Sequence, residues 1–206
     1  MHFYKEFVYP YLVDALGDPP PIRNIRQQII PHAQGTVLEI GAGSGANFSH
    51  YDPTKVNKLY ALEPNPGMIR LAERKRRVTK RDVEFLDLPG ERIPLEDATI
   101  DTVVSTFTLC TISEIADAIR EIARVLKSDG RLIFFELGLS PDPAVQCWQE
   151  RLEPVHRWIF QGLYLTRDIP ALLIKGDFQI EEMQAGYIAS FPKSSTYCWW
   201  GIALRR

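Results

Sequence analysis

The sequence predicts an α/β fold: a doubly wound, mostly parallel sheet that ends in an antiparallel pair of strands. Short apolar runs alternate with segments of helical periodicity through residues 36–136, as in parallel sheets with crossover helices. One run, Ile100–Phe107, is continuous in apolar and β-branched residues, which is typical of a central parallel strand. Two later runs, Phe178–Ala185 and Tyr197–Leu204, are close enough in sequence to pair antiparallel.

The composition favours one domain over residues 1–206. The chain is 45% hydrophobic and 24% charged, which suits a globular protein with a real core. A formal net charge of −2 provides no general attraction to nucleic acid or acidic membranes, so we expect no nucleic-acid partner. Three scattered cysteines favour neither a disulfide framework nor a paired-ligand metal site. With no signal peptide or membrane-spanning run in view, we expect a cytoplasmic protein without a transmembrane anchor.

Residues 1–35 are expected to form helices that cover the core. The first helix is indicated by residues at helical spacing, interrupted by Pro10: Tyr4, Val8, Tyr11, Leu12 and Ala15. Three prolines at 19–21 break the pattern, and Ile22–Ile30 predicts a second helix. Because the aromatic stripe carries few basic residues, we favour packing over the core to contact with a membrane. We hypothesise that this segment is a lid over the ligand site.

The segment Val37–Phe48, VLEIGAGSGANF, predicts a buried strand that stops at a glycine turn and leads into a helix. Gly41, Gly43 and Gly45 permit backbone angles that side chains forbid. They also allow a ligand to approach the backbone closely. Such a turn indicates a binding site.

The spacing around this turn fits two ligands. Gly41, Gly43 and Ala46 match the loose dinucleotide fingerprint, and the acidic Glu63 follows roughly twenty residues later. The competing pattern, acidic-x-Gly-x-Gly-x-Gly, places Glu39 on the strand itself, where a buried carboxylate needs hydrogen-bond donors or a cation. S-adenosylmethionine brings an ammonium and a sulfonium group, whereas a dinucleotide brings a pyrophosphate. We therefore favour S-adenosylmethionine and keep a nicotinamide-dependent oxidoreductase as the alternative.

The following segment continues the alternation. Leu59–Glu63 predicts the second strand, and Asn65-Pro66 combines a capping residue with a proline suited to the first turn of a helix that runs to about Arg77. The basic end of this helix complements the helix dipole on a solvated face, which we favour over a nucleic-acid site. Val83–Leu86 predicts the third strand.

After the fourth strand, Thr111 and Glu114 predict a capping box for a helix that is closed by Gly130. Leu132–Glu136 predicts the fifth strand. Open α/β sheets bind ligands at the carboxyl ends of their strands. Four polar residues fall at these ends: Glu39, Glu63, Thr106 and Glu136.

The remaining chain is expected to shape the substrate side of the site. Residues 144–160 predict a long helix, and Thr166-Arg167-Asp168 opens another that runs to Lys175. We assign 36–136 to a donor-binding core and 137–206 to substrate-side helices and the last two strands. The 144–168 stretch is the segment best suited to form the substrate pocket.

With these residues in view, the sequence resembles the Rossmann-like class I S-adenosylmethionine-dependent methyltransferases over most of its length. Within that superfamily it is similar to the methyltransferase-like proteins that methylate alkyl thiols. The narrower matches are GANF after the glycines, Glu63-Pro64-Asn65-Pro66, Gly90-Glu91, Leu109-Cys110, Trp148-Gln149, Pro154 and Gly162…Leu165-Thr166-Arg167. Those proteins begin with an apolar anchoring helix, whereas this sequence starts at the covering helices, so the resemblance does not imply membrane attachment.

The resemblance implies a donor-binding set made of Glu39, Gly41, Gly43, Gly45, Glu63, Met68, Gly90, Glu91 and Thr106. The glycines would pass beneath the donor, and Glu39 would hold its amino-acid end, directly or through water. Thr106 would lie near the methionine portion, and Glu63 would accept hydrogen bonds from both ribose hydroxyls. Gly90 and Glu91 would meet adenine, with Asp87 as an alternative contact. Met68 would pack on the adenine face.

The acceptor implied is a small molecule with a soft nucleophile, such as a thiol, which needs no dedicated base. For an amine or hydroxyl acceptor the candidate bases are Glu136, His156 and Tyr4, each of which is also explained as a packed structural residue. We interpret Cys110 as a small buried residue at a strand end. Arg167 either binds an acidic acceptor or pairs with a neighbour at the start of a helix. A donor-binding module without catalysis is a further alternative. The sequence leaves the catalytic residues and the oligomeric state open.

Overall fold

The computed structural model describes residues 4–79, 82–189 and 191–206. Within them, the strands form one sheet of order β3-β2-β1-β4-β5-β7-β6. The strands are β1 (Gly35–Ile40), β2 (Val56–Leu62), β3 (Val83–Leu86), β4 (Ile100–Thr106), β5 (Leu126–Leu137), β6 (Phe178–Tyr187) and β7 (Tyr197–Arg205). The strands β1 to β5 pair in parallel, and β7 pairs antiparallel with both β5 and β6. The predicted fold class is confirmed.

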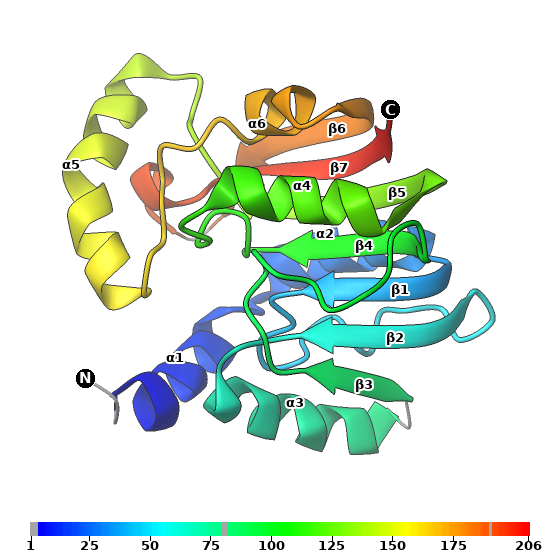
Figure 1. Cartoon of the computed structure of the whole chain (residues 1–206). Coiled ribbons are helices and arrows are strands. Elements are labelled where there is room, and N and C mark those ends of the chain that lie inside the picture. The colour runs from blue at the N-terminus through cyan, green and yellow to red at the C-terminus, as the bar shows by residue number, and fades with distance from the viewer. Residues whose placement is uncertain (1–3, 80–81, 190) are drawn as a thin grey trace.

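Helices lie on both faces of the sheet and at its carboxyl edge. They are η1 (Tyr4–Val8), α1 (Tyr9–Leu16), α2 (Pro20–Ile29), η2 (Ile30–His32), α3 (Pro66–Thr79), α4 (Ile115–Val125), α5 (Pro143–Ile159), α6 (Ile169–Lys175) and η3 (Lys193–Ser195). Figure 1 shows α4 in front of the sheet and α2 behind it. The same view places α1 and α5 beyond the strand ends.

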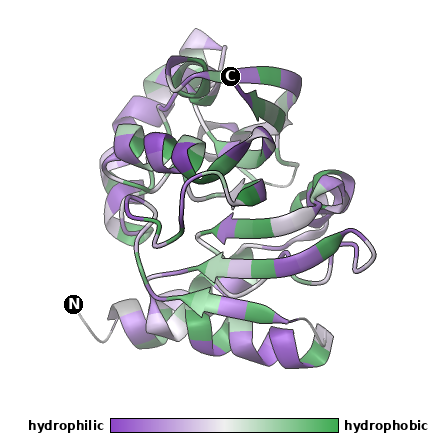
Figure 2. Cartoon of the chain, turned by 45° about the vertical axis from the view of Figure 1, so that its right-hand side comes forward, coloured by the Kyte–Doolittle hydropathy of each residue, from purple (hydrophilic) through white to green (hydrophobic). Residues whose placement is uncertain are grey.

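Each face of the sheet has its own apolar core. Leu38 and Ile40 of β1 pack with α4 and α6, whereas Val37 packs with α2 and η2 on the opposite face. A strand buried on both faces needs the continuous apolar run that the sequence shows. Along the helices that flank the sheet, hydrophobic and hydrophilic residues alternate (Figure 2). Within the described ranges, no helix combines the length and the apolar composition needed to cross a bilayer.

The predicted helix after the glycine turn is wrong. Residues 41–50 form a series of turns instead. Gly41, Gly43 and Gly45 have φ angles of 61°, 54° and 75°, which a right-handed helix cannot contain. The chain then buries Phe48 and Tyr51 against the back of the sheet. These side-chain contacts replace helical hydrogen bonds in fixing the segment.

The predicted capping box and the predicted end of the next helix are also wrong. Glu114 is the N-cap of α4 but makes no side-chain cap, and the Thr111 hydroxyl donates to the Thr108 carbonyl at 2.8 Å. The helix ends at Val125, because Leu126 is already extended and pairs with Ile100 of β4. The strand β5 therefore begins before Gly130 instead of after it.

Candidate functional site

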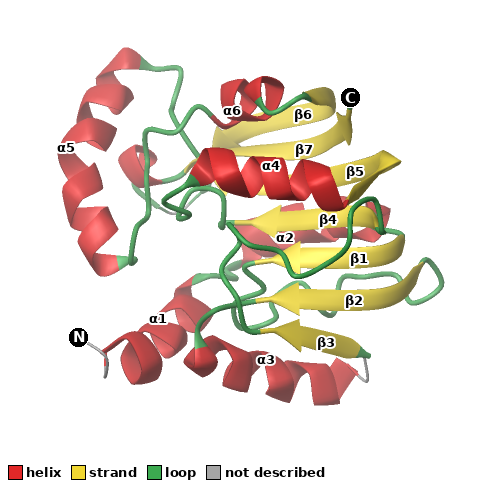
Figure 3. Cartoon of the chain, viewed as in Figure 1, coloured by secondary structure: helices red, strands yellow, loops and turns green. Residues whose placement is uncertain are grey.

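A pocket of about 350 Å³ opens at the carboxyl edge of the sheet, beside α1. The strand arrows in Figure 3 all end toward this edge for β1 to β4. Eight of the nine predicted donor-binding residues line it: Glu39, Gly41, Gly43, Glu63, Met68, Gly90, Glu91 and Thr106. The described lining does not include Gly45, where a Cβ atom would approach the Phe48 ring to 2.8 Å. Gly45 thus allows Phe48 to pack beneath the turn.

The glycine turn presents an open backbone to the pocket at Gly43. A Cβ atom on Gly43 would have the Gly41 carbonyl oxygen, at 3.9 Å, as its nearest neighbour. At Gly41, by contrast, a Cβ atom would overlap the Thr108 side chain. Gly41 therefore permits close packing against the loop after β4, while the space above Gly43 is free for a ligand.

Glu39 is a buried carboxylate on β1, with 1% of its surface exposed. It accepts hydrogen bonds from the Asn47 amide at 2.9 Å and from the Tyr51 hydroxyl at 2.7 Å. Burial raises the pKa of Glu39 to about 7, against the opposing effects of these hydrogen bonds and of the Arg26 charge. A further cation bound nearby would therefore stabilise the ionised form of Glu39 and lower its pKa.

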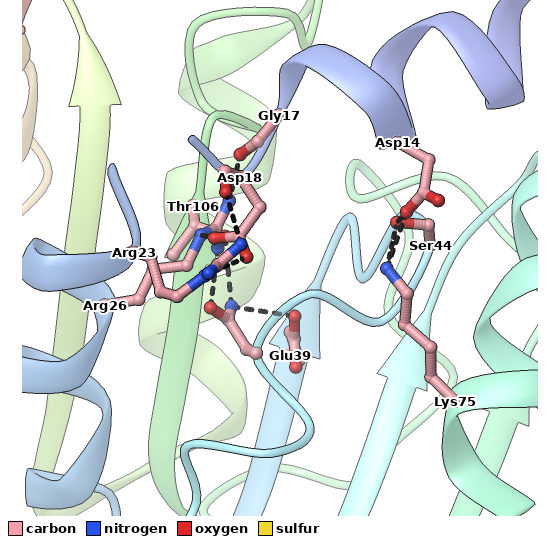
Figure 4. Close-up of polar contacts among 10 residues, drawn as sticks. Asp14, Gly17, Asp18, Arg23, Arg26, Glu39, Ser44, Lys75 and Thr106 are labelled. Carbon is pink, nitrogen blue, oxygen red and sulfur yellow. Dashed lines mark hydrogen bonds and ion pairs between the residues drawn. The ribbon is translucent and has the colours of Figure 1, made fainter. Parts of the chain in front are cut away.

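Arg26, which the sequence reasoning did not single out, lies buried beside Glu39. Its Nη1 donates to Asn47 Oδ1 at 2.6 Å and to Thr106 Oγ1 at 2.9 Å. Its Nε lies 3.6 Å from Asp18 Oδ1, and neither atom has a hydrogen bond within the described chain (Figure 4). Among the described residues that line the pocket, Arg26 is the one basic side chain. An arginine between Ile22 and Ile29 on the apolar face of a helix was the available signal.

Glu63 follows β2 and joins it to the glycine turn. Its two carboxylate oxygens accept the backbone N–H groups of Gly43 and Asn65, each at 2.9 Å. Burial raises the pKa of Glu63 to about 7, in spite of these hydrogen bonds. A carboxylate has about four lone-pair sites, so this one retains capacity for hydroxyl donors.

Gly90, Ile112 and Met68 form an apolar part of the pocket lining. At Gly90 a Cβ atom would lie 2.8 Å from Ile112 and 3.0 Å from Ile40, so only a glycine leaves this wall unstrained. Met68 is 4% exposed and lines the same pocket. Of the two alternative acidic contacts, Glu91 belongs to the described lining and Asp87 does not.

The candidate bases have structural positions outside the described lining of the pocket. Glu136 is fully buried and accepts from Ser105 Oγ at 2.7 Å and from the Thr108 and Cys110 N–H groups. His156 Nδ1 lies 3.0 Å from the Leu152 carbonyl, and the Tyr4 hydroxyl donates to the Ile159 carbonyl at 3.1 Å.

Cys110 and Arg167 also support the loop after β4. Cys110 is completely buried, and burial raises the pKa of its thiol. Arg167 donates to the carbonyl oxygens of Leu109 and Ile112. The two residues, with Glu136, therefore hold the loop that forms one wall of the pocket.

Comparison with known proteins relates this arrangement to one family. The Methyltransferase domain family matches residues 38–134. YrhH of Bacillus subtilis, a methyltransferase by name, is 35% identical to this chain. The matched region covers 67% of this chain and 75% of YrhH. The chain belongs to the class I S-adenosylmethionine-dependent methyltransferase family. S-adenosyl-L-methionine is the methyl donor of that family.

Other comparisons agree with this family. Rat thiol S-methyltransferase TMT1B is 33% identical to this methyltransferase over 72% of the chain and 62% of the rat protein. The chain thus spans less than two thirds of that relative. The crystal structure of YcgJ from Bacillus subtilis superposes with a TM-score of 0.70, at 17% identity over 90% of this chain and 98% of YcgJ. That likeness shows the fold.

This methyltransferase covers its pocket with residues that precede the matched domain. Asp14 on α1 lines the pocket and pairs with Lys75 of α3 at 2.6 Å. Ser44 of the glycine turn donates to the same carboxylate at 2.6 Å (Figure 4). At the other end of α1, the Tyr9 hydroxyl donates to the carbonyl of Phe160 at 3.4 Å. The helix α1 therefore spans from α3 to the end of α5 across the pocket.

Proposed function

We propose that this chain transfers a methyl group from S-adenosylmethionine to a small thiol. The observation that carries the proposal is the arrangement of Glu39, Glu63 and Arg26 around the open backbone at Gly43. Two buried carboxylates and one buried guanidinium match a ligand that carries an ammonium, a carboxylate and a ribose.

The amino-acid end of the donor is assigned to the side of the pocket formed by α2 and β1. The guanidinium of Arg26 suits the donor carboxylate, since its Nε has no hydrogen bond within the described chain. The carboxylates of Glu39 and Asp18 suit the ammonium group, directly or through water. The predicted role of Glu39 at the amino-acid end of the donor is thereby extended: the donor carboxylate has Arg26 as its partner, and the donor ammonium has Glu39 and Asp18.

The nucleoside end is assigned to the segment after β2 and to the loop at Gly90. Glu63 accepts the ribose hydroxyls, while its bonds to Gly43 and Asn65 fix its orientation. Adenine lies between Met68 and the wall at Gly90, with Glu91 accepting from its amino group.

When bound, S-adenosylmethionine supplies a methyl group on a positively charged sulfur. Transfer to a thiol forms one carbon–sulfur bond and breaks another, whose electron pair stays on the donor sulfur, and the thiol proton is released to water. The protein's part is to hold the two sulfurs in line with the methyl carbon, which is worth roughly 7–11 kcal/mol. The helix α1 supports this role by covering the pocket.

A thiol is favoured as the acceptor by two observations. Rat TMT1B is a thiol S-methyltransferase by name. In addition, the described lining of the pocket contains no histidine or lysine, and each of its carboxylates is assigned to the donor or, for Asp14, to the ion pair with Lys75, so none is left as a dedicated base. A thiol of ordinary pKa, about 8.5, provides a few per cent of thiolate near neutral pH without one.

Calorimetric titration with S-adenosylhomocysteine, with NAD as the control ligand, tests the donor. We expect micromolar binding of the former and no heat from NAD; the reverse result would favour a nicotinamide-dependent oxidoreductase. Mass spectrometry of a thiol panel incubated with S-adenosylmethionine then tests the acceptor. Methyl thioethers are expected, whereas donor binding with no turnover of thiols, amines or hydroxyl compounds would leave only a binding module.

A further inference from the structure

Gln161 carries an unmatched polar atom at the edge of the pocket. Its side-chain Nε2 is buried and has no hydrogen-bond partner among the described residues. Its φ angle of 54° belongs to the left-handed position at which α5 ends, where the Gly162 N–H donates to the Arg157 carbonyl, so the fold itself explains the backbone. The unmatched amide has no such explanation. Gln161 lines the pocket, so a ligand is available to account for it.

The backbone on either side of Gln161 fixes its position. The N–H group of Phe160 donates to His156 and that of Gly162 donates to Arg157, which holds the end of α5. The Phe160 carbonyl accepts the Tyr9 hydroxyl of α1. A Cβ atom at position 162 would lie 3.0 Å from the Thr111 carbonyl, so this glycine lies against the loop after β4. Gln161 is thereby held between α1 and that loop.

This part of the pocket is left free by the donor. The residues assigned to the donor come from the link between α1 and α2, from α2, the ends of β1, β2 and β4, the glycine turn, the start of α3 and the loop at Gly90. Two other lining residues are placed near Gln161 by contacts with its neighbours in the chain: the Tyr9 hydroxyl donates to the Phe160 carbonyl, and Gly162 lies against the Thr111 carbonyl. Both side chains are polar and uncharged at neutral pH, so an acceptor bound there meets uncharged polar groups.

We propose that Gln161 is a specificity-determining residue that donates a hydrogen bond to an oxygen atom of the acceptor. The preferred acceptor is then a small thiol that carries a neutral oxygen, such as a hydroxyl or carbonyl, a few bonds from its sulfur. The amide lies at the end of three rotatable bonds, so rotation directs its N–H toward the pocket. A site that hydrogen-bonds an oxygen discriminates against the apolar analogue, because the amide then stays unmatched. This inference rests on the proposed thiol methyltransferase function.

The test compares 2-sulfanylethanol with propane-1-thiol, which have the same number of non-hydrogen atoms. The measured quantity is the ratio of their kcat/KM values with S-adenosylmethionine. Since the two thiols differ in acidity, the change of this ratio on substitution is the informative value. Gln161→Leu is expected to lower the ratio about tenfold, through a loss confined to 2-sulfanylethanol. An unchanged ratio would overturn the role of Gln161.

Two further variants secure the interpretation. Gln161→Glu keeps the size of the side chain and removes its N–H donor, so it should also lower the ratio; it replaces the leucine variant if that one does not fold. Gln28→Leu, at an exposed position of α2, should leave the ratio unchanged. Turnover of both thiols with an unaltered ratio refutes this inference alone. Absence of turnover of either thiol by the wild type refutes the thiol acceptor and this inference together.

Discussion

Asn47 connects the two buried charges at the centre of the site. Its amide oxygen accepts from Arg26 and its amide nitrogen donates to Glu39. Buried charges are tolerated when paired and hydrogen-bonded, and this bridge satisfies one side of each. The other side of the guanidinium, at Nε, has no hydrogen bond within the described chain. The proposed ligand carboxylate at Nε would therefore complete the network instead of disrupting it.

The first prediction concerns Arg26. Arg26→Met should weaken S-adenosylhomocysteine binding by about 1.5–3 kcal/mol, because a charge-assisted hydrogen bond to the ligand carboxylate is lost. Adenosine lacks that carboxylate, so its affinity should be nearly unchanged. Calorimetry with both ligands measures the difference. Arg120→Met, at an exposed position of α4 and paired with Asp117, is the matched control. Equal losses for both ligands would place the carboxylate elsewhere.

The second prediction concerns Glu63. Glu63→Gln should weaken S-adenosylhomocysteine binding by about 1–3 kcal/mol, because a neutral amide accepts the ribose hydroxyls less well than a carboxylate. The 2′-deoxy form of the ligand should lose much less. Glu73→Gln on α3, whose carboxylate pairs with Arg76, serves as the control. A variant that binds the ligand as tightly as the wild type would remove Glu63 from the ribose.

At the scale of elements, the parallel strands were predictable from their apolar runs, which are buried on both faces in the central strands β1 and β4. Val83–Leu86 was predicted at its observed bounds, and Ile100–Phe107 to within one residue. The helix expected after the glycine turn was not found, since the chain beyond Gly45 continues in turns that bury Phe48 and Tyr51. The end of α4 was misplaced because pairing with β4 overrides the local preference of 126–130.

The residues of the candidate site also fall into two groups, those that the sequence predicts and those that it does not. Residues on the strand ends and in the glycine turn were predictable, because topology alone brings strand ends to one edge. Arg26 comes from a helix, Asp18 from the link between α1 and α2, and Gln161 from the end of α5, all outside that pattern. Their positions depend on how α1, α2 and α5 pack over the edge, which spacing within the sequence does not encode.

The third prediction concerns the ion pair between α1 and α3. Lys75→Met removes the ion pair between Lys75 and Asp14. Both side chains are about one third exposed, so the loss of affinity for S-adenosylhomocysteine should be at most about 1 kcal/mol. If α1 is a lid, the dissociation rate of S-adenosylhomocysteine should rise several-fold, as stopped-flow fluorescence can measure. Arg76→Met breaks a pair within α3 and should leave the rate unchanged. Identical rates in both variants would argue against a lid.

For the whole molecule, the pocket is assembled from segments that are distant in sequence. The matched domain, 38–134, supplies the glycine turn, Glu63 and the loop after β4. The preceding helices add Arg26 and the cover, and the end of α5 adds Gln161. The proposed donor residues thus lie mainly in the matched domain, whereas the proposed acceptor contact lies outside it. Acceptor choice can therefore change without altering the sheet.

The last prediction is a pH dependence of stability in the ligand-free protein. Burial raises the pKa values of Glu39 and Glu63 to about 7, above the unfolded value of 4.5. Between these pH values the folded state binds more protons than the unfolded state, so the free energy of unfolding should fall as pH rises from about 5 to 7. Urea denaturation should show a loss of about 1–3 kcal/mol. Burial lowers the pKa of His50, which opposes part of this trend.

Glu39→Gln should flatten this pH dependence, because a neutral amide no longer has to ionise in the core. Donor binding should show the opposite trend with pH. Because S-adenosylmethionine carries a sulfonium and an ammonium group, its affinity should increase from about pH 5 to 7, the range in which Glu39 and Glu63 ionise. A fluorescence titration at several pH values measures this. If stability and donor affinity both stay constant from pH 5 to 8, the two carboxylates are already ionised in the empty pocket. The burial of their charge would then be offset within the protein, by Arg26 and the hydrogen bonds around it, before any ligand arrives.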